Sequence, residues 1–368
     1  MVSADGTAND NYGISVAVSG SLAIVGAPLK SVAMGVVYIY ALGSKGWALQ
    51  EELSEPVFED YAYFGLSVAI NGTLAVVGSP GYESKSGRAY GLVQNGTSWK
   101  FQVLESTAAS VGAGYGRSVA INGKTAIVGA PLAYESAVQS GTVSTFNWNG
   151  TSWVFQTTFA PKDGANGDGF GTSVAVSGTT AIVGAPNKTV TGLANRGAAY
   201  LLALNGTTTP TSTELSEPGG GAAGDLFGSS VAINGSSVVV GAPGWSSGRG
   251  TAYLYLHSTN WLPVGSLVAG DGAIGDAFGS SVSISGSSVL VGAPSASCLS
   301  QGHEGAAYLF TQTASSGWTQ TNKITASDGA PGESFGSSVS IDGANSIIGE
   351  QGANVGPYGA QGAVYFTP

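Results

Sequence analysis

Short segments of alternating small and branched apolar residues recur along the whole chain. In the clearest copy, residues 172–177 alternate with a period of two, which is typical of a β-strand. A Ser-Gly pair at 177–178 follows, and the apolar run 181–183 ends in Gly-Ala-Pro at 184–186. A Gly-containing pair between two such runs favours a tight hairpin. The pattern therefore predicts two antiparallel strands joined by a turn at 177–178.

This two-strand segment begins at a Phe-Gly or Tyr-Gly pair and is present seven times. The pairs lie at residues 12–13, 64–65, 115–116, 170–171, 227–228, 278–279 and 335–336. A repeat of about 50 residues is typical of one supersecondary unit that buries its faces only against neighbouring copies. Because the copies cover nearly the whole sequence, we expect residues 1–368 to form a single domain.

Two further strands complete each repeat. The apolar segment 197–202 predicts a third strand, and a fourth strand carries a tryptophan in most copies, at Trp47, Trp99, Trp153, Trp261 and Trp318. No segment shows helical periodicity. Seven repeats of four antiparallel strands predict an all-β, seven-bladed β-propeller. The small residues of the first strand suit the narrow centre of a propeller, and tryptophan suits its wide periphery.

The two ends of the chain predict where the ring closes. Residues 1–6 align with 267–272, so the chain begins at the end of a fourth strand. Residues 364–366 are a third strand, so the seventh blade lacks most of its outer strand within this sequence. We expect either that residues 1–3 close the ring weakly or that flanking sequence supplies the rest of the strand.

Composition narrows the classes of function. Only 9% of the residues are charged and the net charge is −10, which argues against nucleic acid, a partner that needs clustered Lys and Arg. No run of 18 apolar residues is present, so direct membrane insertion is not expected, and no signal peptide is recognisable. The single cysteine, Cys298, excludes an internal disulfide. The glycines are phased with the repeat, which indicates turns and close packing.

The Phe-Gly and Gly-Ala-Pro signatures resemble those of the FG-GAP repeat family, the propellers of integrin α-chain heads and of many secreted or surface proteins of microbes. The resemblance covers the whole chain. Two copies depart from it, with Gly-Ser-Pro at 78–80 and Gly-Glu-Gln at 349–351. The resemblance implies a secreted or cell-surface binding module, either alone or as one part of a larger multidomain chain.

Calcium is the cofactor that this resemblance raises. Integrin-type propellers resemble one another in an Asp-x-Asp-x-Asp-Gly loop between the first two strands. Here those connections are two-residue hairpins, too short to supply the six to eight oxygen ligands of calcium. We therefore expect no cofactor. The remaining metal candidates precede the Phe-Gly pairs: Asp163, Asp168, Asp271 and Asp276. The competing interpretation, which we favour, is that such aspartates cap their own turns by accepting backbone N–H groups.

The connections between second and third strands carry the most individual side chains. They lie on the same face as the connections between blades, and binding residues concentrate on loops of a rigid scaffold. Aromatic and Arg side chains are frequent anchors for partners. The candidate ligand-binding residues are therefore Tyr82, Arg88, Tyr134, Arg196, Trp245, Arg249, His303 and Tyr358.

Three functions remain open at this point. The first is a binding or adhesion module that recognises an extracellular protein or glycan through the loop-rich face. The second is a lectin-like propeller that uses Trp245 and tyrosines as sugar platforms. The third is a glycan-active hydrolase or lyase with paired carboxylates near the axis. We name no catalytic residues: Cys298, His303 and Glu304 share one loop, but no second ligand pair supports a nucleophilic or metal site there.

Overall fold

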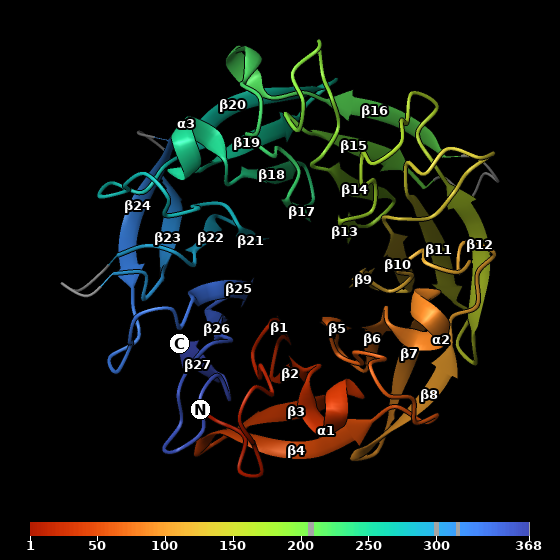
Figure 1. Cartoon of the computed structure of the whole chain (residues 1–368), viewed down its shortest axis with the longest axis vertical. Coiled ribbons are helices and arrows are strands. Elements are labelled where there is room, and N and C mark those ends of the chain that lie inside the picture. The colour runs from red at the N-terminus through yellow and green to blue at the C-terminus, as the bar shows by residue number, and fades with distance from the viewer. Residues whose placement is uncertain (205–209, 298–301, 314–316, 368) are drawn as a thin grey trace.

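Seven antiparallel sheets are arranged radially around a central axis (Figure 1). The computed structural model describes residues 1–204, 210–297, 302–313 and 317–367. The all-β, seven-bladed β-propeller expected from the repeat is confirmed. Within the described residues, no helix is long and apolar enough to span a membrane.

Each blade runs from an inner first strand to an outer last strand. Blade 1 consists of β1 (Ser15–Ser19), β2 (Leu22–Ala27), β3 (Val36–Gly43) and β4 (Gly46–Ser54). Blade 2 consists of β5 (Ser67–Asn71), β6 (Leu74–Ser79), β7 (Arg88–Asn95) and β8 (Ser98–Val103). Blade 3 consists of β9 (Ser118–Asn122), β10 (Thr125–Ala130), β11 (Thr142–Trp148) and β12 (Trp153–Phe159). Blade 4 consists of β13 (Ser173–Ser177), β14 (Thr180–Ala185), β15 (Ala198–Ala203) and β16 (Thr211–Leu215).

The remaining blades continue the same order. Blade 5 consists of β17 (Ser230–Asn234), β18 (Ser237–Ala242), β19 (Thr251–His257) and β20 (Trp261–Leu267). Blade 6 consists of β21 (Ser281–Ser285), β22 (Ser288–Ala293), β23 (Ala306–Thr313) and β24 (Gly317–Ile324). Blade 7 has three strands: β25 (Phe335–Asp342), β26 (Asn345–Glu350) and β27 (Ala363–Thr367).

The turn between the first two strands lies one residue later than its sequence pattern suggests. Ser177 pairs with Thr180, so the two turn residues are 178–179 and the turn at 177–178 that we expected is wrong by one position. Gly178 adopts a positive φ of 57°, which suits a tight hairpin. Ser177 remains in the strand, and its hydroxyl accepts the backbone N–H of Gly235 in the next blade at 3.0 Å.

The repeated glycines allow adjacent blades to approach closely. In blade 4, the Gly171 N–H donates to the Gly184 carbonyl oxygen at 3.0 Å. A β-carbon on Gly184 would lie closer than 3.0 Å to the carbonyl group of Gly228 in blade 5. The Ser173 hydroxyl donates to that same Gly228 oxygen at 2.8 Å. The Phe-Gly and Gly-Ala-Pro signatures therefore mark the junction between blades.

The same serine bond recurs around the whole axis, and we call the set the serine ring. Each member donates to the carbonyl oxygen of the next blade's Phe-Gly or Tyr-Gly glycine at 2.7–2.8 Å. Its members are Ser15, Ser67, Ser118, Ser173, Ser230, Ser281 and Ser338. The last bond, from Ser338 to Gly13, joins blade 7 to blade 1.

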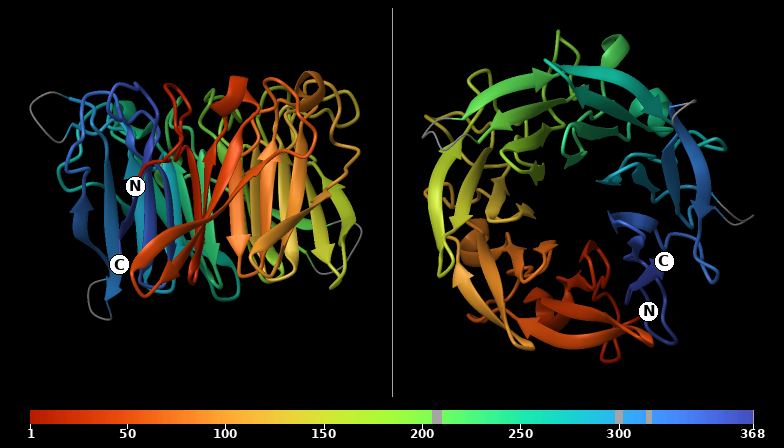
Figure 2. Two further views of the ribbon diagram at one scale, coloured as in Figure 1. Left: turned by 90° about the horizontal axis from the view of Figure 1, so that it is seen from below. Right: turned by 180° about the vertical axis from the view of Figure 1, so that it is seen from behind.

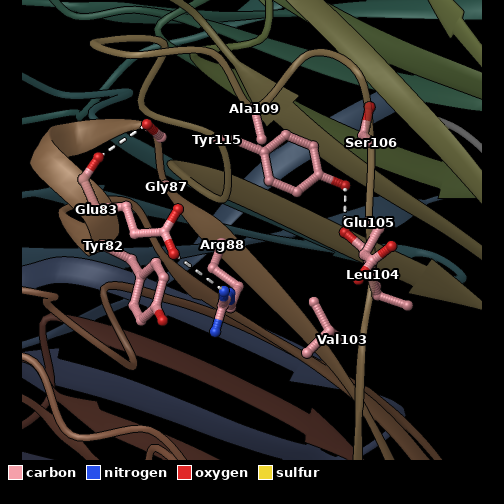
Figure 3. A pocket seen from close by; sticks show the side chains of 11 residues that line it. Tyr82, Glu83, Gly87, Arg88, Val103, Leu104, Glu105, Ser106, Ala109 and Tyr115 are labelled. Atoms are coloured by element: carbon pink, nitrogen blue, oxygen red, sulfur yellow. Dashed lines mark hydrogen bonds and ion pairs between the residues drawn. The ribbon is translucent and has the colours of Figure 1, made fainter.

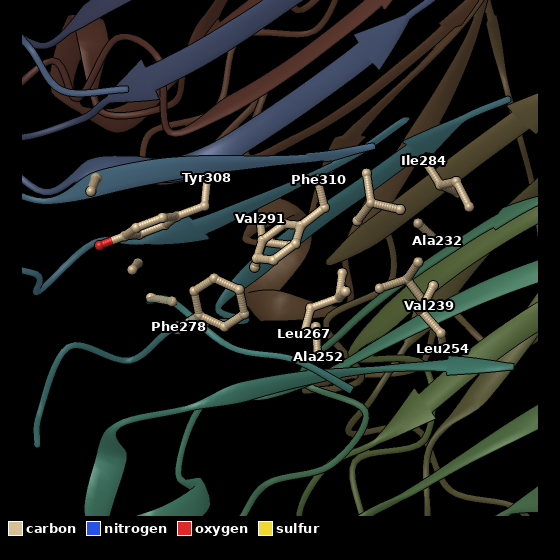
Figure 4. Packing of buried hydrophobic residues seen from close by; sticks show 14 of the residues in the cluster. Ala232, Val239, Ala252, Leu254, Leu267, Phe278, Ile284, Val291, Tyr308 and Phe310 are labelled. Atoms are coloured by element: carbon tan, nitrogen blue, oxygen red, sulfur yellow. The ribbon is translucent and has the colours of Figure 1, made fainter. Parts of the chain in front are cut away.

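The hydrophobic core lies between neighbouring blades. Figure 4 shows the cluster between blades 5 and 6, where Leu254 and Leu267 pack with Phe278, Tyr308 and Phe310. The rings of Phe278 and Tyr308 meet edge to face, with centroids 5.5 Å apart. Such pairs recur because each Phe-Gly aromatic ring is buried against a third strand. Aromatic pairs in this geometry stabilise a core beyond their buried area.

The two faces of the disk differ. One face carries the short hairpins between first and second strands. The opposite, loop-rich face carries α1 (Lys30–Ala33), α2 (Tyr82–Lys85), α3 (Trp245–Gly248) and η1 (Pro218–Gly220); α1 and α2 project from it in the side view of Figure 2. The three α elements contain consecutive residues with positive φ, so each is a single left-handed turn.

Blade 7 is closed by a short contact with the N-terminal segment. The Met1 amino group donates to the Val364 carbonyl oxygen at 2.5 Å, and the Val364 N–H donates to the Met1 carbonyl oxygen at 2.9 Å. Phe366 stacks on Trp47 of blade 1, with ring centroids 4.8 Å apart. Met1 therefore lies against β27 in this chain.

Candidate functional site

The candidate ligand-binding residues are spread over six blades, and the fold brings Tyr82 and Arg88 into contact. Tyr134 and Tyr358 are exposed on the loop-rich face, as is His303. Tyr82 and Arg88 meet in blade 2, where the guanidinium carbon lies 3.6 Å from the centroid of the Tyr82 ring. A cation over an aromatic ring at this distance is a favourable contact.

Arg88 and Tyr82 line a cavity of about 250 Å³ between blades 2 and 3 (Figure 3). Tyr82 begins the left-handed turn α2, and its carbonyl oxygen accepts the Gly87 N–H at 3.0 Å. Arg88 follows at once as the first residue of β7. On the other side of the cavity, Tyr115 is buried and donates its hydroxyl to the Leu104 carbonyl oxygen at 3.1 Å. The cavity thus lies between the left-handed turn α2 and the connection from blade 2 to blade 3.

The polar contacts of Arg88 are long. Its Nη2 lies 3.6 Å from an oxygen of Glu83, an exposed side chain, and its Nη1 donates to the Tyr90 hydroxyl at 3.4 Å. Beneath it, Glu55 is buried, and burial raises the pKa of Glu55. A guanidinium presents five N–H donors in a planar fork that suits a carboxylate or a pair of hydroxyls. The cavity can therefore accept an acidic side chain or the hydroxyl groups of a sugar.

An exposed apolar patch adjoins this cavity. Val32, Phe58 and Tyr61 are all strongly exposed, with 74% of Phe58 accessible to solvent. The Tyr61 N–H donates to the Val32 carbonyl oxygen at 3.3 Å, so the connection between blades 1 and 2 lies against α1. The same connection reaches α2, because Glu59 accepts the Glu83 N–H at 2.8 Å. Sequence reasoning missed this patch, although the run of aromatic residues in the connection between β4 and β5 could have indicated it.

Three more of the proposed anchors, Arg196, Trp245 and Arg249, are partly or wholly covered. Arg196 is only 5% exposed, and its guanidinium donates to the Glu217 carbonyl oxygen and the Thr191 hydroxyl, both at 3.2 Å. Trp245 is half-buried against the core between blades 4 and 5. Arg196 therefore supports its own loop, and Trp245 offers only part of its ring to a ligand. Arg249 is half-buried at the end of the same turn.

The proposed metal ligands all have protein partners. Asp168 and Asp276 are buried, and each accepts a backbone N–H from three residues earlier, at 2.9 and 2.8 Å. Asp163 pairs with Lys188 at 2.8 Å, and Asp271 with Lys323 at 2.5 Å. Over the described ranges, no three His, Cys, Asp or Glu side chains converge so that they could hold a metal ion. The geometry of Asp168 and Asp276 is that of a turn cap.

The histidines offer no catalytic pair. His303 is exposed, and its Nδ1 lies 2.8 Å from the Ser295 carbonyl oxygen. Cys298 lies outside the described residues, so the arrangement of Cys298, His303 and Glu304 is not described. His257 ends β19 and contacts the Trp261 ring, with centroids 5.0 Å apart.

A repeated tyrosine on the third strand is the main feature that sequence reasoning missed. In blade 4, the Tyr200 hydroxyl donates to Asp163 at 3.1 Å, and Lys188 holds the same carboxylate. Tyr residues at the equivalent position also meet a carboxylate in blades 1, 5, 6 and 7: Tyr38 with Asp5, Tyr253 with Glu217, Tyr308 with Asp271, and Tyr365 with Asp328. A Gly-x-x-Tyr pattern, with the glycine just before the third strand and the tyrosine within it, was the available signal in most blades.

Seven blades around one axis, with hairpins on one face and varied connections on the other, define a β-propeller scaffold. The FG-GAP repeat model matches residues 1–40, 47–93, 102–146, 153–202, 217–255, 261–310 and 318–367. The chain belongs to the FG-GAP repeat family, whose propellers are common binding and adhesion modules.

Among solved structures, the chain is similar to Sqt1 of Saccharomyces cerevisiae. The TM-score is 0.51 at 12% sequence identity, and the alignment covers 95% of this chain and 82% of that chain. At this identity the similarity shows the fold alone. No curated protein matches the sequence.

Proposed function

We propose that this chain is a secreted or cell-surface binding module that recognises an extracellular protein or glycan, without catalysis, through its loop-rich face. The observation that carries the proposal is the pairing of the Arg88 cavity with the exposed Val32, Phe58 and Tyr61 patch on one side of the disk. Interfaces are typically centred on aromatic and Arg side chains with apolar neighbours. Occurrence of FG-GAP repeats in extracellular proteins supports the compartment.

The asymmetry of the disk supports the choice of face. The turns between first and second strands carry no exposed large apolar side chain among the described residues. Tyr134 and Tyr358 extend the aromatic surface of the loop-rich face into blades 3 and 7. A chain with few charges and exposed aromatic side chains suits a neutral or mixed partner more than a highly charged one.

The test begins with a ligand from a pull-down and a glycan array with the wild-type chain. Arg88→Met removes the guanidinium but keeps an apolar stem over Tyr82, and Phe58→Ser removes the most exposed aromatic ring. Each change should weaken binding at least about tenfold if these residues are central anchors. Lys124→Met is the matched control, because it removes one positive charge from a turn on the opposite face.

Two results would contradict the proposal. The first is a ligand whose affinity falls with Lys124→Met but is unchanged by Arg88→Met and Phe58→Ser, because binding would then map to the hairpin face. The second is turnover of a glycan in a hydrolase and lyase screen. Melting temperatures of Phe58→Ser and Lys124→Met should stay near that of the wild type, since exposed loop residues contribute little to the core.

A further inference from the structure

Blade 7 departs from the repeat at one buried residue. The residue after the second-strand glycine is small in the other six blades: Ala27, Ser79, Ala130, Ala185, Ala242 and Ala293. In blade 7 it is Glu350, which is only 1% exposed. Its Oε2 accepts the Tyr365 hydroxyl at 2.8 Å, while its Oε1 is buried with no hydrogen-bond partner among the described residues. A buried carboxylate oxygen without a partner is unfavourable.

Glu350 lines a cavity of about 250 Å³ on the loop-rich face, together with Asp328, Glu333 and Tyr365. Both oxygens of Glu333 are occupied, one by the Ala330 N–H at 2.6 Å and one by Asn354 at 2.9 and 3.0 Å. Glu333 is therefore a turn cap, like Asp168. Asp328 and Glu350 are the two carboxylates that remain available to the cavity.

These two carboxylates share one phenol. The Tyr365 hydroxyl lies 2.9 Å from Asp328 Oδ1 and 2.8 Å from Glu350 Oε2. A phenol has a single hydrogen to donate, so it serves only one of the two at a time. Burial raises the pKa of Glu350 to about 7, and the charges of Glu333 and Asp328 act in the same direction. The cavity has an excess of acceptors and of negative charge.

In two other blades, a lysine supplies the positive charge and the hydrogen-bond donors that such a group of acceptors lacks. In blade 4, Lys188 Nζ lies 2.8 Å from Asp163, the carboxylate bonded by Tyr200. In blade 1, Lys30 Nζ donates to the Tyr38 hydroxyl at 2.6 Å and also meets Asp5. Both lysine side chains are largely buried. Each tyrosine–carboxylate pair thus holds an ammonium group.

Blade 7 has Ala353 where these blades have lysine. The carbonyl oxygens of Lys30, Lys188 and Ala353 accept the N–H of the glycine that precedes the third strand, at 3.0–3.1 Å. The equivalence therefore rests on backbone geometry. In blade 6, Lys323 reaches the corresponding carboxylate from β24 instead. No lysine, arginine or histidine lines the blade 7 cavity among the described residues.

One basic group does lie at the cavity, the amino group of Met1. It donates to the Val364 carbonyl oxygen at 2.5 Å, so it is directed along β27. Burial lowers the pKa of this amino group, although Asp328 and Glu350 attract its charged form. It supplies no hydrogen bond to Glu350 Oε1, which remains without a partner.

We propose that this cavity binds a primary ammonium group from outside the chain, the side chain of a lysine on a partner protein, in the position that Lys30 and Lys188 fill in their own blades. The inference rests on the proposed function, because it names a chemical group that the loop-rich face recognises. An ammonium group has three N–H donors, and Asp328, Glu350 Oε1 and the Tyr365 phenol oxygen are three acceptors for them. A metal ion fits less well, because over the described ranges no three His, Cys, Asp or Glu side chains are placed so that they could hold one.

The direct test titrates the full chain with Nα-acetyl-lysine N-methylamide at pH 7 and follows backbone amide NMR signals. Signals of residues 350–354 and 363–365 should shift saturably at millimolar concentrations. The Nε-acetyl derivative, which has no charge, should cause no such shift. Propylammonium distinguishes a free amine from a lysine side chain: equal affinity would show that the ammonium group alone is recognised. Absence of any shift with both charged probes would overturn the proposal.

Two substitutions make the test sharper. Glu350→Ala restores the residue found in most blades; it should raise the melting temperature and weaken probe binding at least tenfold. Ala353→Lys should also raise the melting temperature, because it supplies the ammonium group internally, and it should abolish probe binding. Ala133→Lys is the matched control: Ala133 occupies the equivalent backbone position in blade 3, where Ser106 and Ser144 replace the carboxylate and tyrosine, so it should destabilise.

Two outcomes of these experiments would count against the site. Ala353→Lys could destabilise as strongly as Ala133→Lys, or calcium chloride could give a Glu350-dependent stabilisation while the ammonium probes give none. The first would show that no ammonium fits, and the second that the cavity holds a metal. Neither outcome contradicts the proposed function, which is tested separately by Arg88→Met and Phe58→Ser. Those two substitutions should not change binding of the small probes to the blade 7 cavity.

Discussion

Replacing Gly184 by alanine tests the explanation of the repeated Gly-Ala-Pro signature. Gly184 lies in β14, where blade 4 meets blade 5. An added β-carbon would lie 2.9 Å from the Gly228 carbonyl carbon, and closer still to its oxygen and to the Ser173 hydroxyl. The φ of Gly184 is not in the left-handed region, so alanine is compatible with the backbone itself. The penalty is therefore steric and belongs to the junction between blades.

The size of the effect follows from two contributions. The Gly228 carbonyl must move away, because ordinary contacts between carbon and a carbonyl oxygen lie at about 3.3 Å or more. Overpacking of this kind typically destabilises by about 1–3 kcal/mol. The movement also stretches the 2.8 Å bond from Ser173 to Gly228, and a hydrogen bond contributes about 1 kcal/mol. We expect the free energy of unfolding to fall by about 2–4 kcal/mol.

The assay is urea unfolding followed by tyrosine and tryptophan fluorescence, with the denaturant slope checked for change. Gly265→Ala is the matched control: this glycine lies in β20, its φ is ordinary, and nothing lies within 4 Å of its β-carbon position. It should change stability by no more than about 0.5 kcal/mol. If Gly184→Ala is no more destabilising than Gly265→Ala, the glycine does not set the spacing between blades.

Three further predictions concern closure, metal and pH. Amides of residues 363–366 should exchange faster with solvent than the matching residues 198–202, because among the described residues the outer edge of β27 has backbone hydrogen bonds to Met1 alone. Equal protection would mean that closure is complete by other means. The melting temperature should shift by no more than a few degrees between chelator and millimolar calcium, and a large rise would reveal a metal site that stabilises the native state by mass action. Burial raises the pKa of Glu217 to about 7, so the folded state binds the carboxyl proton more tightly than the unfolded state does. The free energy of unfolding should therefore fall as pH rises from about 5 to 7. Glu217→Gln should reduce this dependence on pH, measured as the urea midpoint at each pH. An unchanged slope in Glu217→Gln would show that other groups govern it.

The number of blades and the strand order could be predicted because they depend on periodic backbone demands. A Phe-Gly pair requires one buried ring and one residue without a side chain, and both leave a signal in the sequence. The turn residues were displaced by one position because Ser177 and Gly178 both suit a turn. Only the bond from Gly235 to Ser177 shows that the serine serves the next blade.

The left-handed turns could not be predicted from sequence. Residues Glu83, Ser84 and Lys85 have φ between 45° and 66°, although none of them favours that region. Within the turn, the Lys85 N–H donates to the Gly81 carbonyl oxygen at 3.1 Å. A neighbouring segment, the connection between blades 2 and 3, holds the turn in place, because the Gly114 N–H donates to the Lys85 carbonyl oxygen at 2.9 Å. Tertiary contacts therefore override the local preference, and no local pattern reports them.

The candidate site shows the same limit. Tyr82 and Arg88 were identified as individual side chains, but their contact depends on the turn between them. Arg196 is an arginine in a connection between second and third strands, where an exposed anchor was expected. Glu217 and the segment around η1 nevertheless cover it. Which loop arginine is buried depends on the neighbouring blade, and the sequence of one loop does not contain that information.

The serine ring is electrically neutral, whereas the outer part of three blade junctions carries lysine–carboxylate ion pairs. Hydroxyl groups and backbone carbonyls do not titrate in the physiological range, and salt does not screen bonds between neutral groups as it screens ion pairs. The pairs of Lys30, Lys188 and Lys323 at the rim are sensitive to both. Acid or high salt should therefore loosen the periphery of the disk while the blades stay joined around the axis. A propeller built in this way can change the charge of its loop-rich face and keep its ring intact.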